Sequence, residues 1–222
     1  MRRFDEIFQI AADRKGGAGA LEALLKSPAP VEELARRPAS DWLQEMARAV
    51  FQAGFSWTVI ETKWPGFRAA FDDFDVNRVA FYHDEDVDRL LSDPGIVRNG
   101  RKIQSVIANA QMLRDLQAET EDVSGHLARW PVTEQNELVT MLGKRGAHLG
   151  GNTAMRVLRQ MGWDAYVTSG DVSKRLILEG VVDKPPTSKT AMKAVQGAFN
   201  TWHKDSGRPM TQISQVLAMS VA

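Results

Sequence analysis

The segment GAHLGGNTAMRVLRQM, residues 146–161, combines glycines and basic side chains in a pattern that can bind an anion. Glycine tolerates the positive φ of a tight turn, so a short hairpin can connect two helices here. At the start of the second helix the backbone N–H groups of Gly150, Gly151 and Asn152 have no helical partner, and the helix dipole favours a negative charge. The segment therefore predicts a backbone site for a phosphate group, to which Thr153 adds a hydroxyl.

A carboxylate follows this hairpin in the stretch TSGDVSKRL, where Asp171 lies 19 residues after Asn152. A carboxylate beside a reacting carbon can stabilise a developing positive charge, and it can orient or deprotonate a water molecule. The simpler alternative is that Asp171 is the N-cap of the helix predicted for DVSKRLILEG, because aspartate is favoured at that position.

Helical periodicity dominates the chain that must position these groups. Apolar residues recur at i, i+3, i+4 and i+7 in many segments, among them 41–54, 101–119, 133–146 and 151–162. Ser188, which follows two prolines that a helix interior does not accept, predicts one helix start. No segment has the alternating pattern of a convincing strand, so we expect an all-α protein.

The domain organisation follows from the scarcity of linkers. The two stretches that come nearest to boundaries, residues 26–38 and 183–189, are too short to separate independent domains. We therefore expect one domain of two helical lobes, about 40–130 and 1–39 with 131–222, with a cleft between them.

The composition restricts the kinds of chemistry that the chain can perform. It has no cysteine, and its four histidines are too scattered along the sequence to suggest a zinc site. No apolar run approaches the roughly 20 residues that span a bilayer, and Asp5 and Glu6 interrupt any signal peptide. We expect a cytoplasmic protein without zinc and without a membrane partner.

The charges balance overall but are unevenly distributed along the chain. Lysine and arginine together number 28, as do aspartate and glutamate, yet acidic residues concentrate in 72–93 while 98–118 and 144–175 are net basic. One basic face can therefore bind a phosphate backbone, although ordinary solvated helix faces are the simpler alternative.

Two features together resemble a known group of enzymes. A helix, a glycine hairpin, a second helix and a downstream aspartate are similar to the helix-hairpin-helix DNA glycosylase superfamily, whose hairpin holds a DNA phosphate and whose aspartate is catalytic. Residues 51–111, which include FQAGFSW and GIVRNGRKI, closely resemble the corresponding segment of the DNA-3-methyladenine glycosylase I family. The resemblance implies a two-lobed helical bundle with a helix-hairpin-helix motif, acting on double-stranded DNA with alkylated bases.

The resemblance also implies which residues contact the DNA. Trp57 matches the position that lies against the extruded base, Phe55 would enter the gap left in the base stack, and Gln52 would meet a base edge or a phosphate. The backbone would be held by hairpin residues and by the stretch DPGIVRNGRKIQ, specifically by Lys144, Arg145, Gly146, His148, Gly150, Gly151, Asn152, Thr153, Arg98 and Lys102. The alternatives are that the aromatic residues are core residues at a helix end, and that Pro94 and Gly95 form a purely structural turn.

Three features of the family are missing from this chain. It lacks the ligands of the family's structural zinc and the N-terminal Tyr-His-Asp-x-Glu-Trp motif, and Ala49 stands where the family has a pocket glutamate. Glu45, one turn earlier on the same helix face, could replace that glutamate. Asn152 stands where bifunctional members carry a lysine, which argues against Schiff-base lyase chemistry.

We therefore expect a monofunctional DNA glycosylase, a hydrolase of N-glycosyl bonds that excises alkylated purines, above all 3-methyladenine, in base excision repair. Asp171 would stabilise the sugar cation. We expect a monomer that needs no cofactor, although the hairpin carbonyls could hold a monovalent cation. The alternatives are a non-catalytic DNA-binding protein that has lost the base pocket, and a helical interaction module with no role on DNA.

Overall fold

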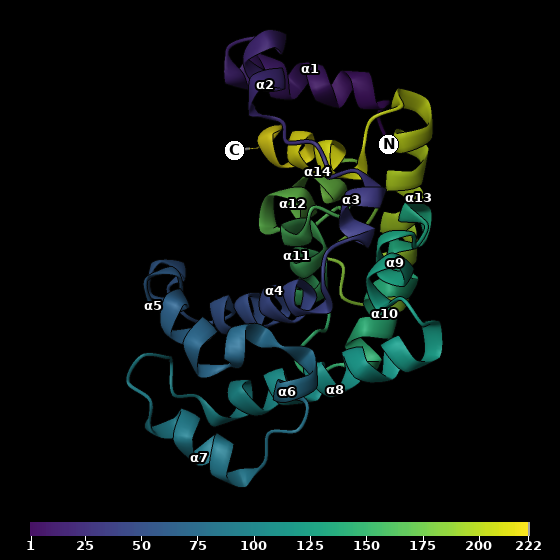
Figure 1. Ribbon diagram of the computed structural model, residues 1–222. Coiled ribbons are helices and arrows are strands. Elements are labelled where there is room, and N and C mark those ends of the chain that lie inside the picture. The colour runs from purple at the N-terminus through teal and green to yellow at the C-terminus, as the bar shows by residue number, and fades with distance from the viewer. Residues whose placement is uncertain (222) are drawn as a thin grey trace. The chain divides into compact units, whose positions relative to one another are not determined.

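The structure, a computed structural model, describes residues 1–221, and its regular elements are helices throughout this range (Figure 1). The prediction of an all-α fold is confirmed. The chain forms two compact units, the first comprising residues 1–29, 130–138 and the chain from Gly162 onward, and the second comprising residues 30–129 and 139–161. This division differs from the predicted lobes, 40–130 and 1–39 with 131–222, in residues 30–39, 130 and 139–161. The hairpin belongs to the second unit because its second helix packs on a helix of that unit.

The first unit is built around its C-terminal helix. Its elements are α1 (Phe4–Lys15), α2 (Ala18–Leu24), the 3-10 helix η2 (Val132–Glu134), the first part of α10 (Gln135–Arg145), α12 (Gly170–Leu178), α13 (Lys189–Ser206) and α14 (Met210–Met219). Helix α14 packs against α1, α12 and α13, and Figure 1 shows it beside α1. Ser188 is the N-cap of α13, as predicted, and accepts a hydrogen bond from the backbone N–H of Ala191 at 3.1 Å.

Aromatic side chains fill the core of this first unit. Tyr166 stacks on Phe199 with ring centroids 4.3 Å apart, and Phe199 meets the edge of Trp202 at 5.6 Å. Burial raises the pKa of the Tyr166 phenol far above its ordinary value. The buried amide of Gln135 makes two hydrogen bonds of 2.9 Å with the backbone of Tyr166. Trp163 and Trp202 are also buried in this unit.

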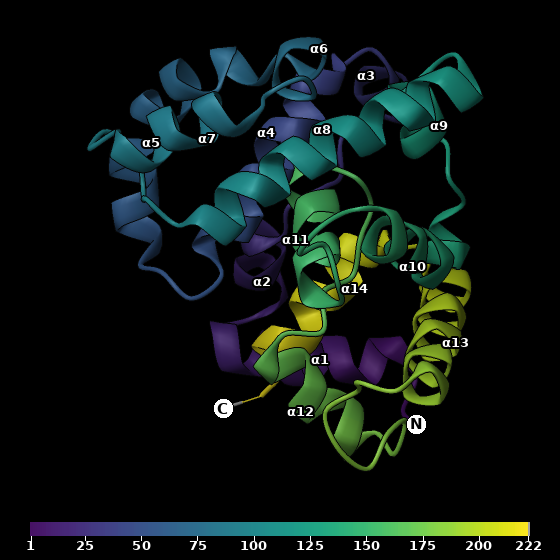
Figure 2. The same ribbon diagram turned by 90° about the horizontal axis from the view of Figure 1, so that it is seen from below.

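The second unit is built around α4 (Ala39–Gln52). Its other elements are α3 (Val31–Ala35), α5 (Trp57–Ala70), η1 (Asp72–Phe74), α6 (Val76–Val79), α7 (Asp84–Ser92), α8 (Gly100–Thr120), α9 (Val123–Ala128), the last part of α10 and α11 (Asn152–Met161). Helix α4 packs against both α8 and α11 (Figure 2). Its apolar residues recur every three or four positions and are buried, as a helix with one core-facing side requires; they include Trp42, Met46 and Val50.

An aromatic cluster joins α4 to α5 in this unit. Phe51 meets the edge of Phe67 at a centroid distance of 4.6 Å, and Trp64 stacks on Phe67 at 5.3 Å and on Phe74 at 5.5 Å. Such pairs each contribute about 0.5–1.5 kcal/mol beyond the burial of their surface. The cluster therefore holds α4 and α5, which the short connection of residues 53–56 joins, against each other.

Candidate functional site

The predicted hairpin lies between α10, which ends at Arg145, and α11, which begins at Asn152. Among its glycines Gly151 has a positive φ of 53°, and the non-glycine His148 has one of 58°. Gly146 is required for a different reason, since a Cβ there would lie 2.6 Å from Leu149 Cδ1. The hairpin therefore depends on glycine for a close contact as well as for backbone conformation.

Asn109 on α8 holds the turn of this hairpin. Its Oδ1 accepts a hydrogen bond from the N–H of Ala147 at 2.7 Å, and its Nδ2 donates to the carbonyl of Ala147 at 3.2 Å. The side chain is only 1% exposed. Sequence reasoning did not identify Asn109, although a polar residue within the apolar stripe of a helix indicates a buried group that needs a partner.

The start of α11 has the geometry expected for an exposed helix N-terminus. Gly150, Gly151 and Asn152 are exposed, and the N–H of Thr153 donates to the carbonyl of Gly150 at 3.2 Å. The backbone amide of Thr153 is thus used inside the turn, while its predicted hydroxyl contact stays a prediction. Gly150 does not have a positive φ, and a Cβ there would have no atom within 4 Å.

The basic residues before the hairpin differ in their surroundings. Lys144 and His148 are exposed. Arg145 makes two 2.6 Å hydrogen bonds with the carboxylate of Glu119 on α8, and this guanidinium lowers the pKa of Glu119. The charge of Arg145 is therefore balanced within the protein, whereas Lys144 has its side chain in solvent.

Lys102 on α8 binds the C-terminal end of α4. Its ammonium donates to the carbonyls of Val50 at 2.8 Å and Phe51 at 3.3 Å, and also to that of Ala53. An ammonium has three donors, so this arrangement uses all of them. Burial lowers the pKa of Lys102. The expected phosphate contact of Lys102 is therefore corrected to a role in positioning the 53–56 loop, while Arg98 is exposed.

The aromatic residues of the QAGFSW stretch lie partly in solvent. Trp57 is 50% exposed and Phe55 is 39% exposed, so the alternative that both are core residues is wrong, although Phe51 is fully buried. A cation faces each exposed ring: the Arg156 guanidinium carbon lies 5.3 Å from the Trp57 ring centroid, and Lys102 Nζ lies 4.6 Å from that of Phe55. The second unit thus presents two aromatic surfaces at the start of α5.

Gln52, which was expected to meet a base or a phosphate, is buried instead. Its Nε2 donates to Glu61 Oε1 at 3.0 Å, and its Oε1 accepts from Gln160 Nε2 at 3.1 Å. With 5% of its surface exposed, the amide connects α4 to α5 and α11. The predicted external contact of Gln52 is therefore corrected, because both ends of its amide are occupied by protein groups.

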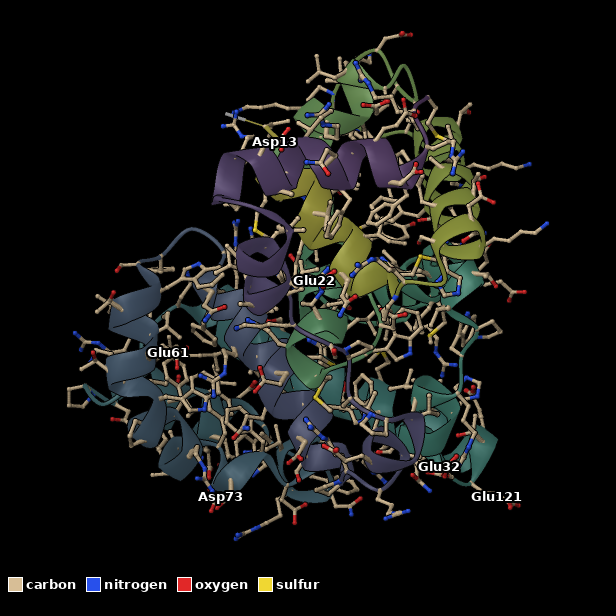
Figure 3. The ribbon with its side chains drawn as sticks, turned by 90° about the horizontal axis from the view of Figure 1, so that it is seen from above. Asp13, Glu22, Glu32, Glu61, Asp73 and Glu121 are labelled. Carbon is tan, nitrogen blue, oxygen red and sulfur yellow. The ribbon has the colours of Figure 1, made fainter. Side chains whose placement is uncertain are left out.

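Two carboxylates lie on either side of Arg48 in the same unit. Glu45, whose side chain is 16% exposed, is 3.3 Å from Arg48 Nε, and Glu61, labelled on α5 in Figure 3, pairs with the other end of the same guanidinium. The guanidinium also lies over the Trp64 ring at 4.0 Å. Burial raises the pKa of Glu45, and Arg48 opposes that shift. Ala49, which follows Arg48 on α4, is buried.

Asp171 lies in the first unit, in the first turn of α12. The N-cap of this helix is Ser169, whose Oγ accepts a hydrogen bond from the N–H of Val172 at 3.3 Å. The alternative that Asp171 is the N-cap is therefore wrong. Its side chain is 56% exposed and lies 3.3 Å from Lys174 Nζ.

The described part of the chain, residues 1–221, contains no group of three or more histidine, aspartate or glutamate side chains arranged to hold a metal ion. None of the helices in the same range is both long enough and apolar enough to cross a membrane.

Comparisons of the sequence with known proteins agree with the resemblance. A family model for methyladenine glycosylase matches residues 40–157, which is more than half of the chain. DNA-3-methyladenine glycosylase 1 of Escherichia coli (strain K12) is 41% identical over 70 residues, which cover 32% of this chain and 37% of that protein. DNA-3-methyladenine glycosylase of Haemophilus influenzae is 32% identical over 60 residues, 27% of this chain and 32% of that protein. The chain thus spans about a third of the length of these relatives.

Solved structures share the fold. A 3-methyladenine DNA glycosylase I in complex with 3-methyladenine has a TM-score of 0.51 and 22% sequence identity, with 60% of this chain and 82% of that chain covered. The Staphylococcus aureus 3-methyladenine DNA glycosylase I has a TM-score of 0.50 and 24% identity, with 60% and 86% covered. At this identity the similarity concerns the fold alone.

Proposed function

Because the chain belongs to the methyladenine glycosylase family, we propose that it is a DNA glycosylase that releases alkylated purines, above all 3-methyladenine, from duplex DNA. Two relatives that are named as DNA-3-methyladenine glycosylases support this substrate class. The proposed enzyme is monofunctional: it hydrolyses the N-glycosyl bond and does not cut the strand, because Asn152 offers no amine for a Schiff base.

One observation carries the proposal: the half-exposed ring of Trp57 faces a guanidinium that comes from the hairpin's own second helix. A glycosylase must turn its target base out of the duplex and hold it by stacking. An alkylated purine is a planar cation, and so is the guanidinium of Arg156 that lies over this indole. The ring of Trp57 therefore suits a flat, positively charged ligand, and it belongs to the same compact unit as the hairpin.

The hairpin supplies the proposed phosphate contact beside the lesion. Within residues 1–221 neither φ nor packing requires a glycine at Gly150. A close approach of an external group to the backbone is a physical reason for glycine there, and a helix N-terminus attracts a phosphate. Lys144 and His148 are exposed nearby to add positive charge or a hydrogen bond.

Asp171 is the proposed catalytic carboxylate. When the N-glycosyl bond breaks, its electron pair goes to the cationic base, which leaves neutral, and the sugar becomes an oxocarbenium-like cation. A carboxylate stabilises that cation electrostatically and takes the proton of the water that adds to the sugar carbon. The proposal is supported by the N-cap of α12, which is Ser169, because the exposed Asp171 carboxylate is then not needed to cap the start of that helix.

Release of free bases from methylated DNA tests this function. The wild type is expected to release 3-methyladenine, and Asp171→Asn to release it at least about 100-fold more slowly, the usual scale for losing one transition-state contact. Asp13→Asn is the matched control, because Asp13 is also exposed and lies on α1 of the same unit (Figure 3). Binding of DNA by the wild type without release of any base would overturn the enzymatic proposal in favour of the non-catalytic alternative. Full activity of Asp171→Asn would instead remove Asp171 from the mechanism.

The proposed enzyme acts as a monomer and without zinc, and a monovalent cation at the hairpin carbonyls strengthens DNA binding. Sedimentation analysis checks the first statement. Base release in the presence of a chelator checks the second, and replacing potassium by lithium during a DNA-binding titration checks the third.

A further inference from the structure

Glu61 is a half-exposed carboxylate one helical turn beyond Trp57. The two residues are related as i and i+4 on α5, so their side chains lie on the same face of that helix, with Cβ atoms about 5–6 Å apart. Trp57 is 50% exposed, and the Glu61 side chain is 49% exposed. A ligand that stacks on the indole therefore has the carboxylate within reach of its edge.

The orientation of Glu61 is set by two donors from α4. Gln52 Nε2 donates to its Oε1 at 3.0 Å, and Arg48 pairs with its Oε2. Gln52 is itself fixed by Gln160 of α11. Each carboxylate oxygen can accept about two hydrogen bonds, so one acceptor position on each oxygen is left for a further donor. The structure thus holds Glu61 in place while half of its side chain stays in solvent.

The charges around Glu61 favour a cationic ligand. Arg48 is shared between Glu61 and the more buried Glu45, so one guanidinium faces two carboxylates. On the neighbouring indole, the flat cation of Arg156 already occupies the ring face. A ligand that takes the place of this guanidinium on the ring is favoured if it is itself a flat cation, because the face of an indole attracts positive charge.

We propose that Glu61 determines specificity at this surface by accepting a hydrogen bond from the amino group of a positively charged purine whose ring stacks on Trp57. The inference rests on the proposed function, because it takes that purine to be the extruded base. Undamaged adenine has the amino group but not the positive charge, so the carboxylate of Glu61 binds alkylated bases more strongly than normal ones.

Binding of two small molecules tests the proposal without DNA and without turnover. The 3,9-dimethyladeninium ion carries the fixed charge and a methyl group in place of the sugar, and 9-methyladenine is its neutral counterpart. Titration of the whole chain with each compound, followed through the indole signal of Trp57 by NMR, gives two dissociation constants and their ratio. The wild type is expected to prefer the cation, and Glu61→Gln to reduce that preference about tenfold, as loss of one charged hydrogen bond does.

Glu32→Gln is the matched control, since Glu32 is likewise an exposed carboxylate of the second unit that pairs with an arginine, Arg129. It is expected to keep the wild-type preference. Glu61→Gln keeps an acceptor oxygen for Gln52, and its melting temperature shows whether the fold is intact.

The outcomes separate this inference from the function on which it rests. An unchanged preference in Glu61→Gln, or a wild type that binds both compounds equally or not at all, overturns the role of Glu61 even where the wild type releases 3-methyladenine. A lost preference in Glu61→Gln supports the role, and it does so whether or not the wild type releases base from DNA.

Discussion

Replacing Asn109 by alanine tests the support of the hairpin. The change removes both hydrogen bonds to Ala147, of 2.7 and 3.2 Å, from a side chain that is 1% exposed. Each bond has a net value of about 1 kcal/mol, and the lost packing adds about 1 kcal/mol, so the free energy of unfolding is expected to fall by about 2–3 kcal/mol. Because the hairpin loses its anchor, the affinity for duplex DNA is expected to fall as well.

Urea denaturation and a DNA-binding titration at fixed salt concentration measure these two effects. Gln104→Ala is the matched control, since Gln104 lies on the same helix but is exposed. Its free energy of unfolding is expected to change by less than about 0.5 kcal/mol. If Asn109→Ala were as stable as this control and bound DNA normally, the role given to Asn109 would be refuted.

Aspartate at the same position refines the test. An ionised Asn109→Asp side chain still accepts from the N–H of Ala147 but cannot donate to its carbonyl. A buried carboxyl has a raised pKa, and its protonated form can donate. The variant is therefore expected to gain stability as the pH falls, while Asn109→Ala is not.

Three further predictions concern neighbouring residues. Gly146→Ala is expected to destabilise the fold by more than about 1 kcal/mol in urea denaturation, because its Cβ would lie 2.6 Å from the Leu149 side chain. Gly150→Ala is expected to leave the stability unchanged and to weaken DNA binding. Equal stability of the two variants would contradict this difference. Burial raises the folded-state pKa of Glu45 above its ordinary 4.5. The contribution of Glu45 to the free energy of unfolding is therefore present below pH 4.5 and is lost as the pH rises through the folded pKa. Glu45→Gln is expected to remove this pH dependence, and the same stability profile in this variant and the wild type would contradict the prediction. Arg98→Ala is expected to reduce the slope of the logarithm of the DNA-binding constant against the logarithm of the salt concentration by about 0.9. Lys102→Ala is expected to leave this slope unchanged and to lower the stability. A reduced slope for Lys102→Ala would show that Lys102 contacts a phosphate after all.

Much of this fold could be predicted from the sequence because its signals are local. Apolar periodicity placed α4, α8 and α11, and the serine after two prolines marked the start of α13. The hairpin was predictable because glycines between two amphipathic stripes are typical of a tight turn between helices. The exposure of Trp57 was expected from the family resemblance. The helical spacing of the aromatic residues around it would equally have predicted a core residue.

The functions of several polar residues could not be predicted, because their partners are distant in sequence. Lys102 resembled a phosphate ligand at a helix start, but the carbonyls that it binds lie about fifty residues earlier. Gln52 was expected to contact a base edge or a phosphate, but its amide is hydrogen-bonded to Glu61 and Gln160. Asn109 was overlooked for the same reason, since its structural role depends on hydrogen bonds with the backbone of Ala147. Such contacts are set by the packing of helices against one another, and the periodicity of apolar residues in the sequence does not show which helices meet.

The most direct measurement is the rate of 3-methyladenine release from methylated duplex DNA by the wild type, by Trp57→Ala and by the control Val59→Ala. Val59 is also exposed on α5. Stacking of a base on an aromatic ring is worth about 1–3 kcal/mol, so Trp57→Ala is expected to release base at least about fivefold more slowly than the wild type, with Val59→Ala unchanged. Equal rates for the wild type and Trp57→Ala would contradict the account of Trp57 as the platform for the extruded base.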